Sequence, residues 1–233
     1  MKNKKLGVLG MTSLAIVACI SMVGCGGEDM PKKEDYSKAL NSVVDTLVTE
    51  EQTAETMSIY PEEDYFSAGN DVDRLLIARL SKFMSTIASS QKFELTTEPF
   101  TCNVTISQTN AVELKVQYSY ADGITSAQII MTDDIDDMSY YQYVNVSIDY
   151  DYETEALNNF TTESYYKMAT GTEAFAFVEY EGESVNWLNP LKESYSTAKA
   201  LAKTNAEAFV NAKYTATEFD FSAEYALSML LGK

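Results

Sequence analysis

The chain has 233 residues, of which 45% are hydrophobic and 12% aromatic, so it carries enough apolar surface to bury a sizeable core. Thirty-five acidic residues against seventeen basic ones give a formal charge of -18, and the chain contains no histidine. These numbers exclude histidine-dependent catalysis and imidazole zinc sites. They also disfavour a nucleic-acid partner, because phosphates bind where lysine and arginine cluster.

The N-terminus has the tripartite plan of a secretory signal peptide. Three lysines precede an apolar stretch over residues 6–23, and the stretch ends in the sequence MVGC at residues 22–25. This ending resembles the lipobox of bacterial lipoproteins, in which a small residue precedes the lipidated cysteine. The resemblance covers residues 1–25 only. It implies that the Cys25 thiol receives a diacylglycerol, that residues 1–24 are removed, and that the mature chain begins at Cys25.

Lipidation implies a place on the extracytoplasmic side of the bacterial cell membrane, or of the outer membrane where the organism has one. Two or more acyl chains make a stable anchor. Removal of residues 1–24 leaves fourteen bases against 35 acids, a formal charge of -21, which repels the body from anionic lipid head groups. Residues 25–35 then read as the lipidated cysteine and a polar linker. The alternative for the apolar stretch is an uncleaved membrane-spanning helix of ~20 residues.

The three cysteines leave no pair for an intramolecular disulfide. Cys19 lies in the removed segment and Cys25 is predicted to be lipidated, so Cys102 is left alone. We expect Cys102 to be a small buried hydrophobic residue in a strand.

Residues 36–233 are predicted to form a single acidic domain. The spacing of apolar residues predicts helices over 36–53 and 71–90 before the strands, and helices over 189–214 and 222–231 after them. Alternating apolar and polar residues predict strands over 93–97, 101–107, 112–120, 124–132, 140–152 and 175–180. Residues 154–169 are ambiguous and favour a helix. The order of elements indicates an α+β fold, with one antiparallel sheet of about five or six strands and helices N-terminal and C-terminal to it.

Four carboxylates lie close together at Asp133, Asp134, Asp136 and Asp137. Calcium takes six to eight oxygen ligands, so this cluster is a candidate metal site, and calcium is the only cofactor that the sequence suggests. The EF-hand pattern fails because Met138 stands at the sixth position, where a glycine is needed. We favour a solvated hairpin turn, whose charges oppose pairing between sheet edges.

The longest predicted strand carries a candidate binding surface on its polar face. Tyr141 and Tyr143 lie on this face beside Asn145, and tyrosine is a good contact residue for proteins and sugars. Asp149 and Asp151 are two residues apart, so they point to the same side and could share a cation or act as an acid pair.

Motifs for nucleotide, redox or acyl-transfer chemistry are missing, so we predict no catalytic residue and a non-catalytic binding or interaction module. Its partner would be an unknown protein or a glycan, besides the membrane that Cys25 anchors. One alternative is a small-molecule or lipid carrier, with a cavity between the sheet and the helices. Another is a carboxylate-dependent enzyme acting on cell-envelope or dietary glycan, which would need Asp149 or Asp151 in a cleft with a raised pKa.

Overall fold

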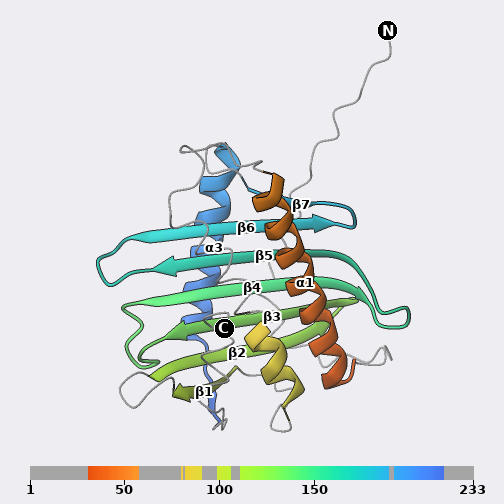
Figure 1. Ribbon diagram of the computed structural model, residues 1–233. Helices are drawn as coiled ribbons and strands as arrows, with labels where there is room; N and C mark the ends of the chain where they lie inside the picture. The colour runs from red at the N-terminus through yellow and green to blue at the C-terminus, as the bar shows by residue number, and fades with distance from the viewer. Residues whose placement is uncertain are drawn as a thin grey trace.

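The computed structural model describes residues 31–57, 80, 82–90, 99–105, 111–188 and 192–217. In this part of the chain, eight strands form one sheet that has helices on both faces (Figure 1). The predicted strand over 93–97 and the predicted helix over 222–231 lie outside the described residues, as does half of the predicted helix over 71–90.

The elements follow the order helix, strands, helix along the chain. The helices are α1 (Lys33–Met57), a helix over residues 82–89, and α3 (Glu193–Asn211). The strands are β1 (Phe100–Thr105), β2 (Ala111–Ala121), β3 (Ile124–Thr132), β4 (Tyr141–Asp151), β5 (Ala156–Lys167), β6 (Glu173–Glu181), β7 (Val185–Trp187) and β8 (Thr215–Ala216). Their order in the sheet is β7-β6-β5-β4-β3-β2-β1-β8, and every neighbouring pair is antiparallel except β1 and β8, which are parallel.

The α+β class is confirmed, but the prediction of five or six strands is wrong. The largest difference is residues 154–169, where the predicted helix is replaced by β5. This strand is rich in threonine and tyrosine, which favour strands, and it pairs with β4 on one side and β6 on the other. Backbone pairing on both sides outweighs the weak helical pattern. The short edge strands β7 and β8 account for the rest of the difference.

The apolar face that the sequence predicts for α1 is buried against the sheet. Tyr36, Leu40, Val43 and Leu47 of α1 are all at most 5% exposed. They share one cluster with the helix over residues 82–89 and with the apolar face of the sheet, which contributes Leu114, Val116, Ile129, Val144, Val146, Ile148, Phe160 and Val178. The Tyr118 hydroxyl joins the sheet to this second helix by donating to the Met84 carbonyl.

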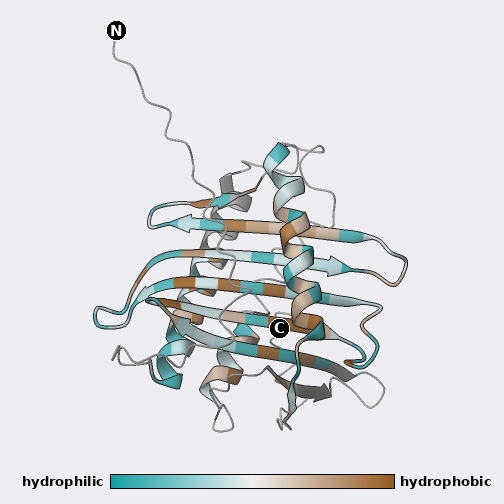
Figure 2. Ribbon diagram, turned by 180° about the vertical axis from the view of Figure 1, so that it is seen from behind, coloured by the Kyte–Doolittle hydropathy of each residue, from teal (hydrophilic) through white to brown (hydrophobic). Residues whose placement is uncertain are grey.

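The opposite face of the sheet is covered by α3, which runs across the strands (Figure 2). Ala202, Ala206 and Phe209 of α3 pack against Ile130, Tyr141, Tyr143, Tyr165 and Phe175 of the sheet. The sequence predicts that this face is polar and open to a partner. That prediction is wrong for the area beneath α3, because the helix occupies it.

The two ends of the strands carry different turns. One end carries the turns at 122–123 and 152–155. We call it the α1 end, because Lys38 of α1 forms an ion pair with Glu155 there. Asp122 and Gly123 both have positive φ, as a two-residue Asp-Gly hairpin turn requires. The other end, which we call the cleft end, carries the turns at 133–140 and 168–172. The 11 residues of β4 separate the two ends, a length of ~35 Å at ~3.3 Å per residue.

Candidate functional site

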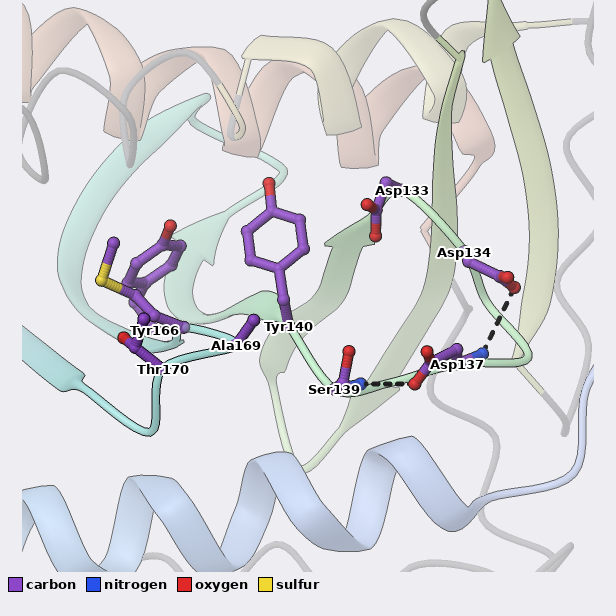
Figure 3. A pocket seen from close by; sticks show the side chains of 9 residues that line it. Asp133, Asp134, Asp137, Ser139, Tyr140, Tyr166, Ala169 and Thr170 are labelled. Atoms are coloured by element: carbon purple, nitrogen blue, oxygen red, sulfur yellow. Dashed lines mark hydrogen bonds between the residues drawn. The ribbon is translucent and has the colours of Figure 1, made fainter.

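An open cleft of about 450 Å³ lies at the cleft end, between the two turns (Figure 3). The β3–β4 turn supplies carboxylates and one ring, and the end of β5 with its following turn supplies a second ring and a thioether. The lining residues are Asp133, Asp134, Asp137, Ser139, Tyr140, Tyr166, Met168, Ala169 and Thr170. The cleft thus joins two segments that are more than twenty residues apart in the chain.

Hydrogen bonds from the backbone fix the acidic turn. Asp134 Oδ1 accepts from the Asp136 amide at 2.9 Å and from the Asp137 amide at 3.2 Å, and Asp137 Oδ1 accepts from the Ser139 amide at 3.0 Å. Two of these aspartates therefore hold the turn in shape. Asp136 lies outside the cleft lining, and the Tyr214 hydroxyl donates to its Oδ1 at 3.2 Å.

The four aspartates of the candidate calcium site remain exposed and do not converge. Among the described residues, no three acidic or cysteine side chains are grouped so that they could hold a metal ion. Calcium binding by Asp133, Asp134, Asp136 and Asp137 stays a prediction that this geometry does not favour, because a calcium site needs several oxygens directed at one point.

Two tyrosines form the aromatic wall of the cleft. The rings of Tyr140 and Tyr166 meet edge to face, with their centroids 6.0 Å apart at an angle of 85°. Burial, and after it the neighbouring Tyr166 and Asp133, raise the pKa of Tyr140, so its phenol is neutral at physiological pH. Met168 is 40% exposed at the rim. Ring faces beside carboxylates can hold a cationic or hydroxyl-rich group, which is a binding chemistry.

Tyr141 and Tyr143, the sequence-predicted contact residues, are 2% and 0% exposed. The expectation of an exposed tyrosine patch is therefore wrong. The Tyr143 hydroxyl accepts a hydrogen bond from Gln128 at 2.9 Å, and its ring lies 6.1 Å from that of Phe209 in α3. Asn145 is half-buried on the same face and donates to Glu163 Oε1 at 3.2 Å, so it too has an internal partner.

Asp149 and Asp151 lie at the α1 end of β4, away from the cleft. Asp149 accepts hydrogen bonds from the side chains of Asn158 and Asn159, next to an irregularity in the β4–β5 register. Hydrogen bonds from Thr154, and from the amide of Glu153, lower the pKa of Asp151. A general acid needs the opposite shift, so Asp151 lacks the property that the enzyme alternative requires.

Sequence reasoning missed the β5 side of the cleft. The sequence pattern predicts a helix over 154–169, which contains Tyr166 and Met168 and is followed by Thr170. No feature of that prediction places these residues beside Asp133. The register between β4 and β5 brings Tyr166 to the cleft, because it pairs Tyr166 with Gln142 of β4. Only a prediction of β5 as a strand could have brought Tyr166 next to Tyr140.

Cys25 lies outside the described residues, so its lipidation stays a prediction. Within the part of the chain that the structure describes, no helix is both long and apolar enough to cross a membrane.

No family model, curated protein or solved structure matches this chain. Its function must therefore be inferred from its own residues.

Proposed function

We propose that this chain is a lipid-anchored, extracytoplasmic interaction module that binds a partner without catalysis and presents the cleft end to it. The observation that carries the proposal is the position of the cleft. It lies at the opposite end of the strands from the start of α1, and α1 follows closely after Cys25 in the sequence.

The distances along the chain favour this orientation. The stretch between Cys25 and Lys33 has few residues, and a flexible chain of that length reaches ~15 Å on average. The contact between Lys38 and Glu155 places the first turns of α1 at the α1 end of the sheet, and the buried side chains of Tyr36 and Leu40 hold them there. An anchor at Cys25 therefore keeps the α1 end near the membrane. The length of β4 then carries the cleft ~35 Å farther out.

The cleft chemistry supports binding of a protein or a glycan. Tyrosine rings offer rigid, amphipathic contact area, and the carboxylates of Asp133, Asp134 and Asp137 can accept hydrogen bonds from a partner's amines or hydroxyls. The carrier alternative gains less support. In the described part of the chain, the space between α1 and the sheet is occupied by the tightly buried side chains of the main core.

The proposal predicts that a partner can be captured at the cleft end and not at the α1 end. A photo-crosslinking amino acid at Met168, on the cleft rim, should give a discrete crosslinked product in whole cells. The same group at Glu153, an exposed residue of the α1 end, should not give that product. Gel shifts and mass spectrometry of the products check this.

A matched pair of tyrosine substitutions serves as the control for the crosslink. Tyr166→Ala removes a cleft ring and should reduce the Met168 product about tenfold, because contact aromatics dominate interface energies. Tyr180→Ala changes a similarly half-buried tyrosine at the α1 end and should leave the product unchanged. Equal products from Met168 and Glu153, or equal losses in the two variants, would contradict the proposal.

A further inference from the structure

The two helices that cover the sheet are attached in different ways. α1 buries large apolar side chains, among them Tyr36, Leu40, Val43 and Leu47. In the 19 residues of α3, the buried residues are Ala202, Ala206 and Phe209. Tyr195, Ala198 and Val210 of α3 are only partly buried against the sheet, so α3 removes less apolar area from water than α1 does and gains less apolar stabilisation. We therefore expect α3 to be held much more weakly than α1.

The middle of the α3 interface is polar. The Glu163 carboxylate of β5 accepts hydrogen bonds from Asn145 of β4 and Asn205 of α3, both at 3.2 Å. The Oδ1 atom of Asn205 is buried and has no hydrogen-bond partner among the described residues. A half-buried carboxylate and a buried, unpaired amide oxygen both cost free energy, and water would solvate both if the helix moved away.

Point contacts hold the two ends of α3. At its C-terminal end, the fully buried Lys115 donates from Nζ to the carbonyls of Val210 at 3.0 Å and Ala212 at 2.5 Å. The same ammonium lies 5.4 Å from the centroid of the Phe209 ring. Near the N-terminal end, the Tyr195 hydroxyl donates to the carbonyl of Phe175 in β6 at 2.7 Å, and at the middle of the helix Lys203 forms an ion pair with Glu173 of β6 at 2.5 Å. Water can replace each of these polar contacts, and the exposed ion pair adds little stability.

The topology allows α3 to leave without breaking the main sheet. It follows β1 to β7 in the chain, and within the residues that the structure describes, up to 217, the only element after it is the two-residue edge strand β8. The main core between α1 and the sheet contains no residue of α3. Opening of α3 therefore leaves that core intact.

We infer that α3 is a releasable cover, which opens as a unit while α1 and strands β1 to β7 stay folded. Opening exposes an aromatic surface made of Tyr141, Tyr143, Tyr165 and Phe175. The inference does not depend on the proposed function of the cleft.

Hydrogen exchange of the full chain in detergent tests the cover directly. The amides of α3 should exchange at least about tenfold faster than those of β4, through an opening that depends less on denaturant than global unfolding does. Nitration provides a second readout. Tyr143, which lies beneath α3, should be nitrated faster than Tyr36, a residue of α1 that is buried to the same degree. Equal exchange and equal nitration on the two sides would overturn the inference.

A pair of core substitutions separates local opening from global unfolding. Phe209→Ala should raise α3 exchange by a further factor of about ten and leave β4 exchange unchanged. Leu40→Ala, in α1, should accelerate exchange in both elements because it weakens the main core. If Phe209→Ala accelerates β4 and α3 equally, α3 belongs to the global folding unit and is not a cover.

Discussion

Replacing Cys25 by serine is expected to abolish incorporation of a labelled fatty acid into the chain and to leave residues 1–24 attached. By the lipobox resemblance, the thioether to diacylglycerol would form on the Cys25 sulfur, and cleavage would follow lipidation. The wild-type chain should carry the label and have the mass of a chain that starts at Cys25. Metabolic labelling and intact-mass measurement check both points.

The other two cysteines provide matched controls for this substitution. Cys19→Ser lies within the removed segment and Cys102→Ser lies in the domain, so both variants should be labelled and processed normally. A Cys25→Ser variant that keeps the label would refute the anchor. So would a wild-type chain that retains residues 1–24 without lipid, because that result would establish the membrane-spanning alternative.

The free energy of unfolding is expected to fall steeply above about pH 10. Burial raises the pKa of Tyr141 and of Tyr152 to about 12, and it raises the pKa of Tyr36, Tyr143 and Tyr165 further. Unfolded tyrosine titrates near pH 10. A raised folded pKa contributes stability that is complete below the unfolded value and is lost as the pH rises through the folded one.

The expected loss is large because several tyrosines act together. A shift of two pKa units corresponds to about 3 kcal/mol, and a domain has only ~5–15 kcal/mol of stability in total. We expect cooperative unfolding, with a joint rise of tyrosinate absorbance and loss of circular dichroism. Stability that stays flat to about pH 11, while the tyrosines titrate one by one in the folded protein, would contradict the packing described here.

Lys115 contributes to the pH dependence with the opposite sign. Burial lowers the pKa of its ammonium to about 8, whereas an unfolded lysine titrates near 10.4. Between these values the unfolded chain binds more protons, so stability should rise with pH before the tyrosines reverse the trend. Lys115→Met should remove this rise and keep the alkaline collapse. Denaturant titrations at a series of pH values distinguish the two contributions.

The sequence predicts the middle of the sheet well because each strand there has one apolar and one polar face. Alternation places Leu114 and Val116 of β2, and Val144 and Val146 of β4, in the same core, and Asp122-Gly123 sets the hairpin between β2 and β3. It does not predict β5, whose strand form depends on backbone pairing with β4 and β6. Such pairing is a long-range effect that leaves a weak local pattern.

The same limit explains the candidate site. The acidic turn at 133–137 is recognisable because its aspartates are adjacent in the sequence, and its carboxylates do accept turn hydrogen bonds. Tyr166 reaches the cleft only through the β4–β5 register. The covering of Tyr143 could not be predicted either, because its strand face looks polar. An alanine-rich helix can still cover such a face when polar partners such as Asn205 and Lys115 accompany it.

By the proposed function, the membrane anchor and the cleft lie at opposite ends of the molecule. Energy transfer from a fluorescent label on the lipidated chain to an acceptor in the lipid head groups measures this most directly. One label goes on Thr170→Cys at the cleft end and one on Glu153→Cys at the α1 end, both in a Cys102→Ser background. Both residues are exposed. Energy transfer from the label at position 170 should be clearly weaker than transfer from the label at position 153. Equal transfer, or stronger transfer from position 170, would contradict the proposal.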